Sequence, residues 1–98
     1  MITEPALQEV RGLIRQVLAA QDVDVYLFGS WVKGTHGSSS DIDIGIEPHT
    51  PLPPGTLAIL RERLEESHIP YRVEVVDLTA VDEAFRAAVI REGIRWTG

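Results

Sequence analysis

A glycine–serine pair and two closely spaced aspartates are the residues of this chain that could do chemistry together. Gly29 and Ser30 end a short apolar segment, and Asp41 and Asp43 open another after the ten residues 31–40. A strand that ends in Gly-Ser and turns into a helix presents backbone N–H groups and a hydroxyl to a phosphate. Two carboxylates at positions i and i+2 of a strand point the same way and can share hard cations. The spacing therefore predicts a site for magnesium and a polyphosphate.

A later glutamate can supply a third carboxylate. If Glu74 lies on the same face as Asp41 and Asp43, it can ligate the cation nearest an attacking hydroxyl, or accept the proton of that hydroxyl. The alternative is that Glu74 is an exposed strand residue paired with Arg72, which shares its face. Asp77 is expected on the opposite face and is the weaker candidate.

Hydrophobic periodicity predicts the elements that must position these residues. Apolar residues at spacings of three and four predict helices, whereas β-branched runs and period-two alternation predict strands. The expected helices cover 4–20, a single turn at 30–33, a segment from Leu57 to near His68, and a last helix capped by Thr79; the expected strands cover 23–28, 41–46 and 71–77. Residues 34–40 and the four-proline stretch 48–55 are expected to be loops. Three strands with flanking helices predict a small α+β fold, an α/β sandwich.

Length and composition limit the class of protein. The 98 residues predict one domain spanning 1–98, and 44% hydrophobic with 24% charged residues is typical of a soluble globule. Because the chain has no cysteine, any metal must be held by oxygen or imidazole. A chain this short buries a smaller fraction of its surface than a larger domain would, so a homo- or hetero-oligomeric partner could add stability.

The charge balance and the apolar segments exclude further classes. Nine basic against 15 acidic residues give a net charge of −6, which argues against direct nucleic-acid binding, because such binding depends on neutralising phosphates. No apolar run is long enough to cross a membrane, and the amino terminus has no signal-peptide pattern. We therefore expect a cytoplasmic protein without a membrane partner.

Taken together, these segments resemble the minimal nucleotidyltransferases of the DNA polymerase beta superfamily. The Gly-Ser to Asp-x-Asp spacing is the specific feature of a resemblance that covers nearly the whole chain. The segments that carry it are Phe28-Gly29-Ser30, Ser40-Asp41-Ile42-Asp43, Val73-Glu74-Val75-Val76-Asp77-Leu78 and Ile90-Arg91-Glu92-Gly93. The resemblance implies a nucleotidyltransferase fold with a mixed sheet. It also implies that Gly29 and Ser30 bind a nucleoside triphosphate and that Asp41, Asp43 and Glu74 surround magnesium.

The resemblance also implies an activity and a partner. Family members transfer a nucleoside monophosphate to a hydroxyl and release pyrophosphate. Many of the smallest are antitoxins encoded beside an all-helical HEPN ribonuclease toxin, and some modify a tyrosine of that toxin with AMP. For this chain, ATP is the expected donor, Mg²⁺ the expected cofactor in a two-metal site, and a HEPN-type toxin the expected acceptor. Because 98 residues are enough only for the transferase core, we expect the acceptor to be held by a partner and not by a second domain of this chain.

Two other functions stay open at this stage. A degenerate transferase could neutralise its partner by contact alone, with the acids merely inherited. A nucleotide sensor could bind ATP and magnesium without transferring anything.

The chain departs from the family pattern after Gly-Ser. The family often has arginine at the next position and again two residues later, where this chain has Trp31 and Lys33. Lys33 can meet a phosphate as a point charge without the bidentate fork of arginine, or it is a plain surface lysine. Trp31 could stack on a base or simply pack. The third acid is Glu74, where small family members commonly have aspartate.

The remaining polar and aromatic candidates are weaker. The histidines His36, His49 and His68 have no ligand spacing and are expected to be solvated, with His36 at the rim of the site. Ile94 and Trp96 are expected to be docking residues, against the domain itself or at an interface.

Overall fold

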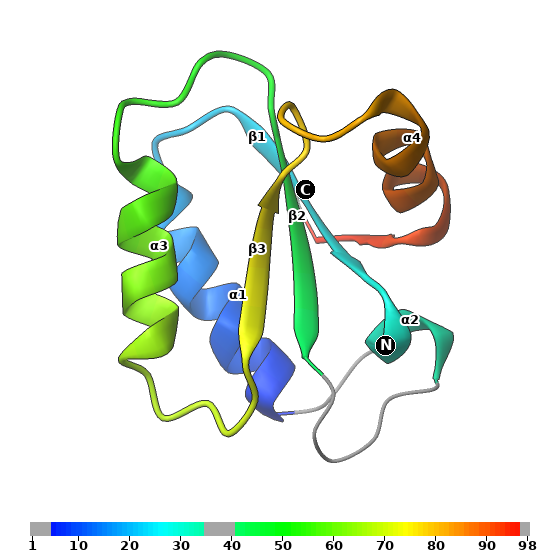
Figure 1. The fold of residues 1–98 in the computed structure, drawn as a ribbon. Helices are drawn as coiled ribbons and strands as arrows, with labels where there is room; N and C mark the ends of the chain where they lie inside the picture. The colour runs from blue at the N-terminus through cyan, green and yellow to red at the C-terminus, as the bar shows by residue number, and fades with distance from the viewer. Residues whose placement is uncertain (1–4, 35–40, 97–98) are drawn as a thin grey trace.

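The computed structural model describes residues 5–34 and 41–96, and there the chain forms one mixed sheet flanked by helices (Figure 1). The elements in chain order are α1 (Pro5–Leu18), β1 (Val23–Phe28), α2 (Ser30–Lys33), β2 (Ile42–Pro48), α3 (Thr56–Glu65), β3 (Val73–Asp77), α4 (Glu83–Glu92) and β4 (Ile94–Arg95). This arrangement confirms the predicted α+β fold. Residue 4 of the first predicted helix and most of the predicted loop 34–40 lie outside the described residues.

The sheet has the strand order β3-β2-β1-β4. Strand β2 runs antiparallel to β1 and parallel to β3, which makes the sheet mixed as expected. The prediction of three strands missed β4, which pairs antiparallel with β1 through only two residues. A strand of two residues has no periodicity, and its position is set by long-range contacts such as the bond from Trp96 N to Val25 O at 2.7 Å.

One face of the sheet carries the main core. The alternation of β2 sends Ile42, Ile44 and Ile46 to this face, where each is 0% exposed. Helices α1 and α3 cover it, and they contribute buried residues such as Val10 and Leu60 (Figure 1). Because alternate residues point the other way, Asp43, Gly45 and Glu47 of β2 must face the opposite side.

Helix α4 covers part of that opposite face. A second apolar cluster forms there from Tyr26 of β1, Leu78 after β3, and Val89 of α4. Gly45 gives Leu78 its room, since a Cβ at position 45 would lie 3.1 Å from Leu78 Cδ1.

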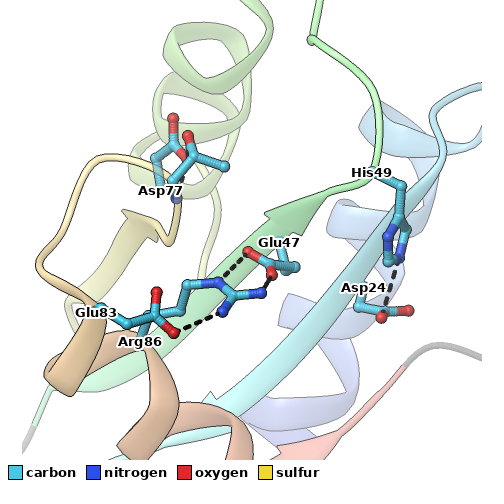
Figure 2. Close-up of polar contacts among 7 residues, drawn as sticks. Asp24, Glu47, His49, Asp77, Glu83 and Arg86 are labelled. Carbon is cyan, nitrogen blue, oxygen red and sulfur yellow. Dashed lines mark hydrogen bonds and ion pairs between the residues drawn. The ribbon is translucent and has the colours of Figure 1, made fainter.

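A buried carboxylate fastens α4 to the sheet (Figure 2). Glu47 is 8% exposed, and both of its carboxylate oxygens face the guanidinium of Arg86 on α4. Arg86 Nε donates to Glu47 Oε1 at 3.1 Å, Arg86 Nη2 donates to Glu47 Oε2, and Arg86 Nη1 donates to Glu83 Oε1 at 3.1 Å. A bidentate pair of this kind sets the helix in one position on the sheet.

The start of α4 corrects a prediction from the sequence. Asp82, not Thr79, caps the helix, since its Oδ1 accepts a hydrogen bond from Phe85 N at 2.9 Å. Thr79 belongs to the preceding turn, where its hydroxyl and its N–H both donate to Asp77 Oδ1. Either residue has the right chemistry for a cap, and the path of the turn after β3 decides between them.

The carboxyl-terminal aromatic residue packs into the domain itself. Trp96 is 8% exposed and joins the main core, and Arg11 Nη2 donates to its carbonyl oxygen at 3.1 Å. Ile94 remains 38% exposed. In the described part of the chain, no helix has the length and apolar character needed to span a bilayer.

Candidate active site

The pairing of β2 with β3 brings two of the predicted acids side by side. Asp43 and Glu74 are register partners in adjacent parallel strands, so their side chains leave the same face of the sheet. Asp43 is partly buried, and the side chain of Glu74 is 49% exposed. The condition set from the sequence, that Glu74 share a face with Asp43, is met.

Asp41 lies just before β2 and completes a group of three acids. Burial raises the pKa of Asp43, and the negative charges of Asp41 and Glu74 raise it further. Asp43 therefore lies within electrostatic range of both Asp41 and Glu74. Hard divalent cations prefer such oxygen donors, and a cation among them would relieve the repulsion.

Three carboxylates are a set of donors that suits magnesium, but their side chains do not converge on one point in this structure. Within residues 5–34 and 41–96, no group of three His, Cys, Asp or Glu side chains is already gathered closely enough to hold a metal ion. Glu74 lies 3.6 Å from Arg72 Nη2, in the pairing given as the alternative from the sequence. The Arg72 side chain is 73% exposed, and such a pair is weak in water, so it leaves Glu74 available to other partners.

Gly29 brings the predicted phosphate-binding turn directly against Asp43. Phe28, the residue before Gly29 in the chain, is the register partner of Asp43 in β2, and Gly29 itself has φ 82° and ψ −152°. A Cβ at this position would overlap Asp43 Oδ2 and lie 3.2 Å from Asp43 Cγ. Glycine is required here both for the backbone conformation and for the close approach of the carboxylate.

The turn continues into the four-residue helix α2. The N–H groups of Val32 and Lys33 donate to the carbonyl of Gly29 at 3.1 and 3.2 Å. Ser30 is partly exposed at the start of this helix, and Lys33 is exposed at its end. Both side chains can reach a ligand from solvent, as a phosphate-binding role requires.

Trp31 packs into the core. It is 8% exposed, and its ring meets Tyr71 edge to face with centroids 4.9 Å apart. Of the two roles that its position in the sequence allowed, packing is therefore the one observed, and its ring has no free face for a base.

Two of the hollows on the surface of the described chain are lined in part by residues of β3, and one of these two includes Glu74. A groove of about 660 Å³ follows the edge strand β3, and Arg61, Tyr71, Arg72 and Glu74 help to line it. The other, of about 680 Å³, lies against the proline-rich connection after β2 and includes none of the predicted site residues. Glu74 is the one member of the predicted site that borders this first groove.

Two of the three histidines lie in the described part of the chain, and both are exposed to solvent. His68 is exposed, as expected. His49 is 45% exposed, yet its Nε2 lies 3.0 Å from Asp24 Oδ2, a contact also visible in Figure 2. Arg95 of β4 donates to the other oxygen of Asp24 at 2.9 Å. His36 lies outside the described residues.

An aromatic pair on the same face as Asp43 was not among the site residues predicted from the sequence. Phe28 and Phe85 meet edge to face with ring centroids 5.8 Å apart, although they are far apart in the chain. Phe28 could have been noticed as the neighbour of Gly29. No local pattern links Phe85 to the site, because only the packing of α4 on the sheet places it there.

Two comparisons of the sequence with known proteins both identify nucleotidyltransferases. Residues 14–96 match the family described as polymerase beta, nucleotidyltransferase. The chain is 33% identical over 88 residues to a Haemophilus influenzae protein named "Probable protein adenylyltransferase MntA", covering 90% of this chain and 75% of that protein.

Solved structures agree with this assignment. A toxin–antitoxin structure with AMP-PNP superposes with a TM-score of 0.69 at 27% identity, over 90% of this chain and 73% of that one. A mutant of an MntA toxin–antitoxin complex superposes with a TM-score of 0.72 at 26% identity, over 100% of this chain and 74% of that one.

Proposed function

Since the chain belongs to the polymerase beta nucleotidyltransferase family and is a nucleotidyltransferase, we propose that it transfers AMP from ATP to a hydroxyl group of a partner protein, with magnesium as cofactor. The observation that carries the proposal is the meeting of Asp43, Glu74 and the Gly29 turn on one face of the sheet. A triphosphate donor agrees with the AMP-PNP bound in a related toxin–antitoxin structure.

The proposed roles follow from the positions of the side chains. Ser30 and the neighbouring backbone bind the β- and γ-phosphates, and the exposed ammonium of Lys33 adds a positive charge. Asp41, Asp43 and Glu74 would hold magnesium, which would supply positive charge to neutralise the phosphates.

The reaction forms one bond and breaks one. The acceptor hydroxyl oxygen attacks the α-phosphorus in line with the bond to the bridging oxygen of the β-phosphate, and pyrophosphate leaves with that oxygen. Of the three predicted acids, Glu74 is the one that borders the groove along β3, and it orients the hydroxyl and takes its proton. Catalysis then depends mainly on positioning and on neutralising charge.

For the acceptor, we propose a HEPN-type toxin, which makes this chain the antitoxin of a pair. The support is the relation to MntA and to solved toxin–antitoxin complexes. A protein acceptor also agrees with the open groove beside Glu74, which gives a side chain on another molecule access to the site.

The test is transfer of label from α-labelled ATP to the purified partner in the presence of magnesium. Wild-type protein should label the partner, and Asp43→Asn and Glu74→Gln should each abolish labelling while leaving the circular dichroism spectrum unchanged. The matched control is Asp77→Asn, on the same strand as Glu74. An asparagine can still accept the turn bonds of Thr79, so labelling should persist. Tight complex formation without label would instead support neutralisation by contact.

A further inference from the structure

An exposed aromatic ring lies on the same face of the sheet as the predicted catalytic acids. The six aromatic residues of the chain all lie in its described part, and Phe85 is the exposed one, at 40%. Its ring meets Phe28 nearly at a right angle, with an interplanar angle of 83°. In an edge-to-face pair of this kind, Phe28 leaves at least one face of the Phe85 ring uncovered.

The aromatic pair is continuous with the proposed phosphate-binding turn. Phe28 is bonded directly to Gly29 in the chain, and it is the register partner of Asp43 across the β1–β2 ladder. Directly opposed residues on one face of an antiparallel pair have Cβ atoms about 4.5–5.5 Å apart. The Phe28 side chain therefore lies beside the Asp43 carboxylate that would hold the metal ion, and the Phe85 ring packs against Phe28 with ring centroids 5.8 Å apart.

The position of Phe85 is fixed before any ligand binds. Its own N–H is held by the Asp82 cap at 2.9 Å. The next residue, Arg86, makes the bidentate pair with buried Glu47 of β2, seen in Figure 2 between α4 and the sheet. Because α4 is held at both of these points, the backbone that carries Phe85 is already ordered, and no helix has to form or dock when a flat group stacks on the ring.

We infer that Phe85, supported by Phe28, is the stacking surface for the base of the nucleoside triphosphate whose phosphates bind at the Gly29–Ser30 turn. The inference rests on the proposed function, since it assigns the base end of the same substrate. An aromatic face accepts any base, because every base has a π-face. Trp31, which directly follows the turn in sequence, is excluded from this role by its burial against Tyr71.

The test compares two ligands that differ by the nucleoside. Isothermal titration in magnesium measures binding of ATP and of inorganic tripolyphosphate to wild-type protein and to Phe85→Ala. We expect Phe85→Ala to weaken ATP binding about tenfold, within the range for one base stacked on an aromatic side chain. Its affinity for tripolyphosphate should stay within about twofold of wild type, and this result also reports that the variant is folded.

Two further variants make the comparison specific. Phe85→Tyr keeps the ring and should bind ATP as wild type does. Ile59→Ala removes an apolar side chain that is 53% exposed on α3, on the far side of the sheet, and should leave both affinities unchanged.

The outcomes separate this inference from the proposed function. If wild-type protein binds ATP and tripolyphosphate equally well, or if Phe85→Ala binds ATP as tightly as wild type, the base does not stack on Phe85 and the inference alone is wrong. If wild-type protein binds neither ligand, the proposed function fails, and the inference fails with it.

Discussion

Replacing Gly29 with alanine should destabilise the fold by about 3 kcal/mol. Two effects contribute: strain in the backbone and steric overlap of the new Cβ with Asp43. The backbone at Gly29, with φ 82° and ψ −152°, is in a region that other residues occupy only at a cost of about 1–3 kcal/mol. The new Cβ would also overlap Asp43 Oδ2 and lie 3.2 Å from Asp43 Cγ. Moving the carboxylate aside relieves part of this overpacking and leaves about 1–2 kcal/mol.

Urea denaturation followed by circular dichroism measures this loss. The midpoint should fall with no change in the slope, which reports the surface exposed on unfolding. For a domain of this size, about 3 kcal/mol corresponds to a melting temperature lower by roughly 12–24 °C. Nucleotidyl transfer should be lost as well, because Gly29 brings the turn against Asp43.

Two other glycines provide matched controls. Gly34 has φ 75° with no atom within 4 Å of an added Cβ, so Gly34→Ala should cost only the backbone component, about 1–2 kcal/mol. Gly12 lies within α1, also with open space around it, so Gly12→Ala should stabilise the protein by about 0.5–1 kcal/mol.

A double-mutant cycle isolates the contact between the turn and the acid. In an Asp43→Ala background the carboxylate is absent, so Gly29→Ala should cost about 1–2 kcal/mol less than it does in wild type. If Gly29→Ala costs the same in both backgrounds and no more than Gly34→Ala, the close approach of Gly29 to Asp43 does not exist in the folded protein.

Three further changes have expected outcomes that simple measurements check. Because burial and two neighbouring charges raise the pKa of Asp43 in the folded state, its ionisation removes stability as pH rises, so Asp43→Asn should melt higher than wild type at pH 7. That advantage should vanish below about pH 3, where the carboxyl is protonated in both the folded and unfolded states; an equal gain at every pH would contradict the argument. Arg86→Ala should lower the urea midpoint by stranding buried Glu47, whereas the same change at Arg91, whose exposed pair with Glu92 is weak, should leave it nearly unchanged. Trp31→Ala should cost about 3–5 kcal/mol of stability, and a variant that stays fully stable yet loses ATP binding would show that Trp31 faces the ligand after all.

Local sequence patterns were enough to predict most of the elements around the site. The isoleucines of β2 alternate with small or polar residues, and that alternation placed Asp43 and Gly45 on the face away from the main core, as observed. The predicted first helix, 4–20, runs two residues past the end of α1 at Leu18, where apolar spacing carries little information. The same local reasoning failed at β4, which is too short to have a period.

The sequence by itself determined which groups are available: three carboxylates, a Gly-Ser turn and a spacing typical of one enzyme family. These are properties of residue type and of the two-residue period of a strand, both readable along the chain. Tertiary structure alone decided that Glu74 is the register partner of Asp43, that Trp31 is buried against Tyr71, and that Phe85 lies beside Phe28. The physical reason is that strand register and helix docking are fixed by the best burial of the whole apolar surface, which joins residues that no local pattern connects.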